Sequence, residues 1–147
     1  MKTKLLNQDG ERTFVLIFDK GEEFIDGLTS FARENELGGG HFTAIGAFRD
    51  VMLGYFQPET NSYRQIPVVE QVEVLSLAGD IALKDNIPDV HAHVVVGKSD
   101  GTAHGGHVIE AHIWPTLEVI LIESPKHLRR RVDLETGLAL IDLDASS

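Results

Sequence analysis

The chain of 147 residues contains no cysteine, so disulfides and thiolate metal ligands are excluded. It has no apolar run near the roughly 20 residues that a membrane-spanning helix needs. It also has no basic leader ahead of an apolar segment, the mark of a secretory signal. Aromatic residues are few, at 7%, but a hydrophobic content of 42% is enough for a folded core. We therefore expect a cytoplasmic protein without a membrane partner, folded as a single domain over residues 1–147 with its core at about 10–143.

Positive charge is also scarce. The 13 lysines and arginines face 23 acidic residues, which gives a net charge of −10. Proteins that bind the DNA backbone neutralise phosphates with Lys and Arg, so this composition opposes general DNA binding. One basic cluster is present, formed by Lys126, His127, Arg129, Arg130 and Arg131. Since no aromatic residues are interleaved with it, we interpret the cluster as a solvated surface rather than a nucleic-acid patch.

Apolar periodicity predicts one helix among many strands. A helical stripe from Phe24 to Ala32 predicts a long helix over 22–36, ended by a cap at Gly38. Strands are predicted at 12–18, 42–47, 51–56, 62–66, 68–78, 91–97, 107–114, 117–123 and 138–143, with a loop at 85–88 and frayed ends at 1–10 and 145–147. One helix against many strands at hairpin spacing indicates an α+β fold, a single compact domain with a mainly antiparallel β-sheet packed on the helix.

The strongest chemical signal is a group of histidines, four of the seven lying within residues 91–107. His91 and His93 alternate on a predicted strand, so both imidazoles should leave the same face. The turn signal Asp100-Gly101 then reverses the chain, and His104 and His107 follow on the returning strand. A hairpin of this kind can bring imidazoles from both of its arms to one metal ion.

The hairpin register decides which histidine is the third ligand. A two-residue turn would place His104 on the face of His91 and His93. A one-residue bulge at Gly105-Gly106, or a three-residue turn, would place His107 there instead. Glycine pairs suit bulges because one residue often needs positive φ. The glycines therefore favour His91, His93 and His107, with His104 as the rival third ligand.

Three neutral imidazoles leave one position open on a tetrahedral zinc ion, as in catalytic zinc sites. Imidazole also suits copper, nickel and iron, so the expected cofactor is zinc or another divalent transition metal. Glu118 lies in a strand with apolar residues on both faces, and a carboxylate there needs a partner or a function. Glu118 and His104 are the candidate catalytic residues, as proton-transfer groups beside a metal-bound water.

The remaining histidines carry less information. His112 differs from His107 in strand parity, so we place it on the opposite face of the sheet. His41 and His127 are interpreted as surface residues.

Several spaced motifs together resemble the plants-and-prokaryotes-conserved (PPC) domain over about residues 10–143. They are Val74–Gly79, His91-Ala92-His93, Asp100-Gly101 with Gly105-Gly106-His107, Pro115–Val119, and the upstream stretch from Gly46-Ala47-Phe48 to Leu53-Gly54-Tyr55. The resemblance implies a compact α+β domain that assembles as a homotrimer. It also implies a metal, usually zinc, on His91, His93 and His107.

The resemblance also bears on DNA. In plants the domain accompanies AT-hook segments that grip the minor groove, while the domain itself serves assembly and partner binding. Prokaryotic members carry a DNA-binding label through that association. This chain has no Arg-Gly-Arg-Pro-type hook, and it keeps the three histidines that plant members tend to lack. DNA as a partner is therefore implied by the family but disfavoured by the charge.

Three functional hypotheses follow. The first is a homotrimeric, metal-binding module for regulation or assembly, with DNA association inherited from the family. The second is a small metal-dependent hydrolase or small-ligand-binding protein that uses the open metal position. The third is a purely structural metal that stabilises the trimer.

Overall fold

The computed structural model describes residues 1–7 and 9–146. Within them the chain forms one α-helix and nine strands. In chain order these are β1 (Lys2–Asn7), β2 (Thr13–Phe18), α1 (Phe24–Glu34), β3 (Gly39–Gln57), β4 (Ser62–Val68), β5 (Val72–Lys84), β6 (Ile87–Gly97), β7 (Ala103–Glu123), β8 (Arg130–Val132) and β9 (Ala139–Ile141). The described residues include no helix with the length and apolar character that a bilayer-spanning segment needs.

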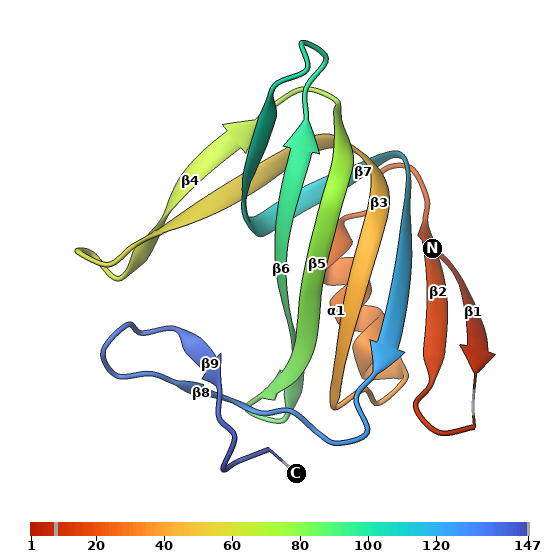
Figure 1. The fold of residues 1–147 in the computed structure, drawn as a ribbon, viewed down its shortest axis with the longest axis vertical. Coiled ribbons are helices and arrows are strands. Elements are labelled where there is room, and N and C mark those ends of the chain that lie inside the picture. The colour runs from red at the N-terminus through yellow and green to blue at the C-terminus, as the bar shows by residue number, and fades with distance from the viewer. Residues whose placement is uncertain (8, 147) are drawn as a thin grey trace.

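Seven strands form one antiparallel sheet in the order β1-β2-β7-β6-β5-β3-β4. The long strands β3 and β7 also pair with each other, so β3, β5, β6 and β7 close into a ring of neighbours. Figure 1 shows the sheet curving around α1, with β3 and β4 extending as an arm and β8 and β9 lying beside its lower edge. This arrangement confirms the predicted α+β class with a mainly antiparallel sheet packed on a single helix.

The core lies between α1 and the face of the sheet turned toward it. Phe24 of α1 packs edge-on against Phe42 of β3, with ring centroids 6.0 Å apart, and both side chains are buried. In β6, Ala92, Val94 and Val96 are buried among these apolar side chains. Side chains alternate along a strand, so the intervening residues of β6 project from the opposite face. Burial of the even-numbered side chains of β6 in the core therefore places His91 and His93 on the opposite face of the sheet.

The helix is shorter than the predicted 22–36. It begins after Glu23, whose side chain accepts a hydrogen bond from the Asp26 N–H at 2.6 Å, the usual role of an N-cap. It ends at Glu34, because Glu36 adopts a positive φ of 54° and Leu37 turns back into the core. The expected cap at Gly38 is therefore wrong: the reversal is made two residues earlier.

Two of the long strands were predicted as pairs of short ones. β3 runs unbroken over 39–57, and β7 runs through Pro115. The irregularities that suggested breaks are register shifts inside the ladder, one of them between Gly46 and Phe48. Gly46 has φ +148°, and a Cβ there would lie 2.4 Å from the Thr116 carbonyl oxygen. Glycine therefore permits the close approach of β3 and β7, and the strands bend instead of ending.

Three further differences concern the N-terminal segment, one turn and the pairing of the last strand. The N-terminal segment expected to fray is strand β1, paired with β2. The expected loop at 85–88 is a tight turn in which Asp85 and Asn86 have φ of 52° and 63°, as in a type I′ hairpin. The last predicted strand is confirmed as the short β9, but it pairs with β8 and forms a separate two-stranded sheet.

The histidine hairpin uses a three-residue loop. The Lys98 N–H donates to the Thr102 carbonyl at 2.8 Å, and Gly101 has φ +83°. His93 then pairs directly with His107. The register is thus the three-residue alternative, and neither the two-residue turn nor the bulge at Gly105-Gly106 occurs, because the ladder stays regular through both glycines.

Candidate metal centre

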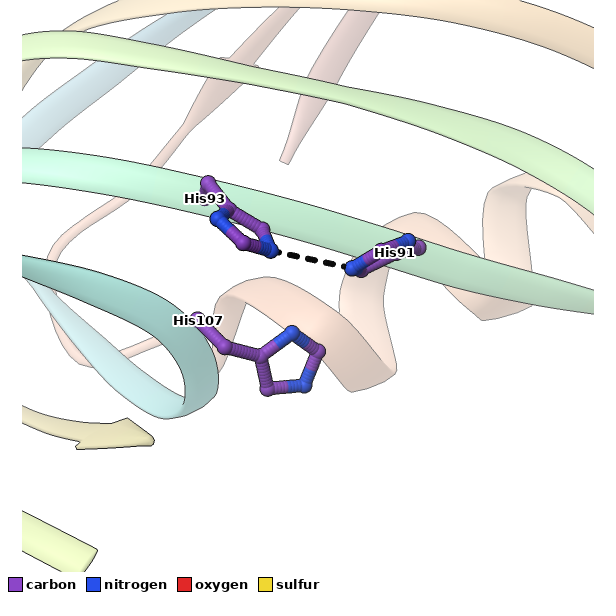
Figure 2. Close-up of side chains that lie close together, drawn as sticks. All are labelled: His91, His93 and His107. Atoms are coloured by element: carbon purple, nitrogen blue, oxygen red, sulfur yellow. Dashed lines mark hydrogen bonds between the residues drawn. The ribbon is translucent and has the colours of Figure 1, made fainter. Parts of the chain in front are cut away.

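Three imidazoles meet on the sheet face turned away from α1. His91, His93 and His107, here called the histidine triad, each offer a ring nitrogen, and these three nitrogens lie within 4.8 Å of one another. The Nε2 atoms of His91 and His93 are 3.1 Å apart. Figure 2 shows the two rings converging from β6 while the His107 ring comes from β7. Two adjacent arms of one hairpin therefore build the whole cluster.

The third ring is held in a form that can bind a cation. The Nδ1 atom of His107 is buried and has no hydrogen-bond partner. Figure 2 shows that atom on the side of the ring that faces His91 and His93. Burial, with the nearby His91 and His93 rings, lowers the pKa of His107 to about 4, and burial is also the main cause of the lowered pKa of His91. Both rings are therefore neutral near pH 7 and keep a lone pair.

The donor set fits a small divalent metal. Zinc binds imidazole nitrogen at about 2.0–2.1 Å, which places neighbouring nitrogens of a tetrahedral site roughly 3.3 Å apart. The 3.1 Å between Nε2 of His91 and Nε2 of His93 is close to that value. Without a cation, one of these rings must donate its proton to the other, and the buried Nδ1 of His107 stays unsatisfied. A metal would resolve both features and keep one coordination position open.

Tyr63 of β4 holds the His107 ring in place. The two rings stack with centroids 4.7 Å apart and an interplanar angle of 24°. Gly54 pairs with His107 across β3 and β7, and a Cβ at Gly54 would lie 2.8 Å from the Tyr63 Cδ1 atom. The absence of a side chain at Gly54 therefore leaves the space that the Tyr63 ring occupies.

A pocket of about 310 Å³ opens beside the triad and is called here the triad pocket. It is lined by Tyr63, Lys84, Asp89, Val90, His91, His107, Arg130, Gly137, Leu138, Ala139 and Leu140. The C-terminal segment reaches it because the Leu83 N–H donates to the Leu128 carbonyl at 2.7 Å, which ties that segment to β5.

Arg130 corrects one sequence interpretation. The basic cluster is predicted to be solvated surface, yet the Arg130 side chain is only 3% exposed. Its guanidinium bonds to Asp80 of β5, and its Nε lies 3.0 Å from the Asp89 carboxylate without an aligned hydrogen bond. The interpretation holds for Arg131, which is 73% exposed. Two facing carboxylates offset the cost of burying one cation.

The other candidate residues lie apart from the triad. His104 pairs with Val96, which faces the core, so it cannot share the triad's face. Glu118 is exposed further along β7, where it lines a different hollow, with Ile45 and Ile120. The structure thus does not bring either candidate proton-transfer residue to the triad.

Of the remaining histidines, His112 bonds to Asp50 at the edge near the start of α1, away from the triad. The predicted opposite face is wrong, because a register shift beside Val108 reverses the alternation along β7. Val108, Ala111 and Ile113 are all buried, so His112 projects from the same face of β7 as His107. His41 and His127 are exposed, as predicted.

Sequence reasoning missed Tyr63 and the role of Arg130. Tyr63 lies in a short polar strand that gives no periodic signal. Arg130 belongs to a run of basic residues whose members looked equivalent. Only the pairing of distant strands shows that both belong near residues 91–107.

The fold and the triad define a class: an α+β domain that presents three imidazoles on the outer face of its curved sheet. The sequence profile of the Plants and Prokaryotes Conserved (PCC) domain matches residues 6–125. The chain belongs to this family, also abbreviated PPC, as the motifs predicted. None of the curated proteins is significantly similar to the chain.

Solved structures agree with this membership. A metal-containing protein from Archaeoglobus fulgidus is 33% identical, with 95% of this chain and 99% of that chain covered and a TM-score of 0.84. A PPC protein from Pyrococcus horikoshii is 30% identical, with coverage of 93% and 97% and a TM-score of 0.85. A candidate DNA-binding protein from Bacteroides thetaiotaomicron shares the fold at 24% identity, with coverage of 97% and 98% and a TM-score of 0.89.

Proposed function

We propose that this protein is a metal-binding PPC-family module that holds one divalent transition metal per chain, zinc fitting best, on His91, His93 and His107. The observation that carries the proposal is the buried, unpartnered Nδ1 of His107 facing two Nε2 atoms that lie 3.1 Å apart. The metal-containing relative from Archaeoglobus fulgidus supports it. The metal would supply a positive charge and an open coordination position, while the chain holds the three rings in place.

We further propose that the protein assembles as a homotrimer. The outer face of the sheet exposes large apolar side chains: Ile45 at 61%, Leu75 at 56% and Ile120 at 42%. With Val15 they line a hollow of about 400 Å³. Contiguous exposed apolar surface of this kind is a common mark of a protein interface. Contact with further copies of the chain would cover it.

DNA is a weaker candidate partner. One neighbour is a candidate DNA-binding protein, but it shares only the fold with this chain. A net charge of −10 repels the phosphate backbone. We therefore place assembly and small-ligand binding ahead of DNA, and a gel shift on AT-rich duplex at low salt should show no complex.

Elemental analysis with light scattering on protein purified without chelators tests the proposal. We expect about one zinc or related metal per chain and the mass of a trimer. Removal of the metal by EDTA should lower the melting temperature, because an ion that binds only the folded state stabilises it. Protein that takes up no zinc, nickel or cobalt when these are added would refute the metal centre, and a monomeric mass would refute the assembly.

A further inference from the structure

The triad pocket is lined by residues that the binding of a metal by three histidines does not require. Its far wall comes from residues 130–140, beyond the 6–125 stretch that the family profile matches. The wall is tied to β5 by the Arg130–Asp80 ion pair. A segment that did no more than cover the triad would not need to keep a pocket of about 310 Å³ open beside it.

The charges around the pocket cancel when no metal is bound. Lys84 and Arg130 line it as cations. Asp89 also lines it, and Asp80 bonds to Arg130. Since imidazole coordinates a metal as a neutral ligand, a bound divalent metal leaves the site with an excess of two positive charges. The loaded pocket therefore attracts an anion, whereas the metal-free pocket does not.

The size and the apolar wall restrict which anion fits. Leu138 and Leu140 supply large apolar side chains to the lining, beside the charged ones. Ligand pockets usually measure about 300–1,000 Å³, so this one is at the small end. Inorganic phosphate would leave the apolar wall in contact with water. A small organic acid would fill both parts.

We propose that the triad pocket binds a small carboxylate-bearing molecule, with its carboxylate toward the metal and its apolar body against Leu138 and Leu140. This inference rests on the proposed metal centre. Arg130 acts as a positioning residue, since its charge is engaged by Asp80 and Asp89 while it holds the pocket wall. Exposed Lys84 adds attraction for the anion.

Full-length protein loaded with Co²⁺ provides the test, because the visible spectrum of Co²⁺ changes when its coordination changes. Isobutyrate should shift the spectrum saturably, with a dissociation constant on the order of 1 mM or tighter. The isosteric neutral amide, isobutyramide, should bind at least about tenfold more weakly, because it lacks the charge. Inorganic phosphate should compete poorly with isobutyrate.

Two variants locate the binding. Leu138→Trp fills the apolar part of the pocket and should abolish the isobutyrate response while cobalt content stays at one per chain. Lys84→Met should weaken isobutyrate about threefold, the size expected for an exposed charge. Lys4→Met, on exposed β1, removes the same charge far from the pocket and is the matched control.

The outcomes separate the two proposals. Protein that binds no cobalt overturns the metal centre and with it this inference. Protein that binds cobalt but responds equally to isobutyrate and isobutyramide, prefers phosphate, or keeps its full response in Leu138→Trp overturns the inference alone.

Discussion

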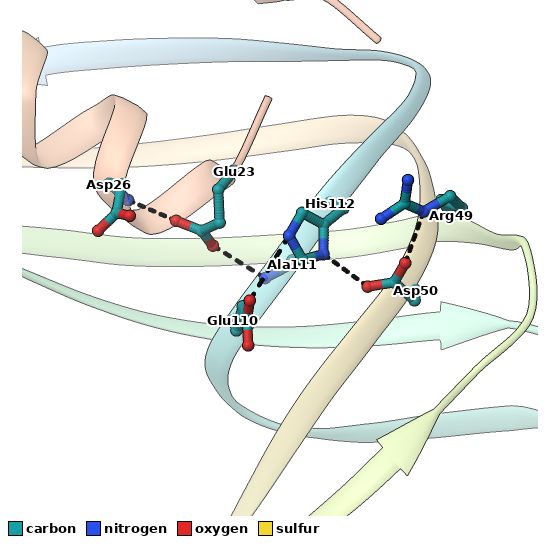
Figure 3. A network of polar contacts seen from close by, with 7 residues as sticks. All are labelled: Glu23, Asp26, Arg49, Asp50, Glu110, Ala111 and His112. Carbon is teal, nitrogen blue, oxygen red and sulfur yellow. Dashed lines mark hydrogen bonds and ion pairs between the residues drawn. The ribbon is translucent and has the colours of Figure 1, made fainter. Parts of the chain in front are cut away.

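The same strand, β7, carries histidines in two opposite settings. In the triad, His107 meets two other imidazoles, and within residues 1–7 and 9–146 no carboxylate forms an ion pair with any of the three. His112 instead lies between carboxylates: its Nδ1–H donates to Asp50 at 2.6 Å, and its Nε2 lies 3.5 Å from Glu110 (Figure 3). We call Glu23, Arg49, Asp50, Glu110 and His112 the His112 network.

The difference shows how neighbouring side chains determine the role of a histidine. Among imidazoles, burial keeps a ring neutral and leaves lone pairs for a cation. Among carboxylates, a ring nitrogen is engaged as a hydrogen-bond donor, and the side chain serves a structural role. Glu23 illustrates the structural role, because its carboxylate caps α1 through Asp26 N–H and also accepts from the Ala111 N–H at 2.9 Å. Substitutions in the two settings should therefore have different readouts.

The largest expected effect is on metal content. His107→Ala should lower metal affinity more than about 100-fold, because it removes a direct ligand and even indirect partners of metal ligands matter 10–100-fold. His112→Ala is the matched control from the same strand and should keep one metal per chain. Elemental analysis after dialysis measures both, and equal metal content in the two variants would contradict the assignment.

Next comes the stability of the helix start. Glu23→Ala should lower the free energy of unfolding by about 1–2 kcal/mol, because it removes an N-cap acceptor and leaves the Ala111 N–H unpaired. Glu23→Gln keeps an acceptor oxygen and should lose less. Urea unfolding measures the change, and metal content should not differ among the three proteins. A shift in metal content with Glu23 would show that the two settings are coupled.

A smaller effect is expected at the stacked ring. Tyr63→Leu should weaken metal binding about fivefold, because a stacked aromatic pair contributes about 0.5–1.5 kcal/mol to holding His107. Tyr55→Leu on the neighbouring β3 is the control, since Tyr55 is 64% exposed. Competition with a colourimetric chelator measures the affinity. Identical values for the two variants would mean that Tyr63 does not position His107.

The smallest expected effect is on the pH dependence of the free energy of unfolding. Burial raises the pKa of Asp50, but hydrogen bonds from Arg49 and His112 outweigh it, so the pKa lies below its ordinary value of 3.8. Because the pKa of Asp50 is lower in the folded state than in the unfolded state, the ionised carboxylate stabilises the fold at pH values above its ordinary pKa. This stabilisation is lost as the pH falls through the folded-state pKa. Asp50→Asn should therefore cost less than about 1 kcal/mol at pH 7 and nothing once Asp50 is protonated. Urea unfolding from pH 7 to pH 3 checks this; a difference that grows toward acid pH would contradict it.

Much of the fold was predictable because the spacing of apolar residues along each segment already indicates which side chains are buried. The stripe of α1 and the alternating residues of β6 point to the buried face without any tertiary information. The continuity of β7 through Pro115 was not predictable, since a proline usually marks a strand end and only the partner β3 shows that the ladder resumes. The reversal at Glu36 was not predictable, because it needs a positive φ at a non-glycine residue while Gly38, two residues later, favours such a conformation.

The candidate site also contains residues that were predictable from the sequence and residues that were not. His91, His93 and His107 lie within one hairpin, so strand parity and turn length reduced the choice to two sets. The turn length itself was not fixed, because Asp100-Gly101 fits both a two-residue turn and the end of a three-residue loop. Tyr63 and Arg130 reach the triad from distant parts of the chain, and their positions depend on how β4 and β8 are placed.

The short hairpin that carries the triad has a consequence for how the protein would acquire the proposed metal ion. Closing a short loop costs little chain entropy, so all three donors can meet before β4 or the C-terminal segment has docked. Recruitment of the ion can then precede completion of the fold, and it would fasten the β6–β7 register against slippage while the slower, long-range pairings of β3 with β5 and β7 are still being made.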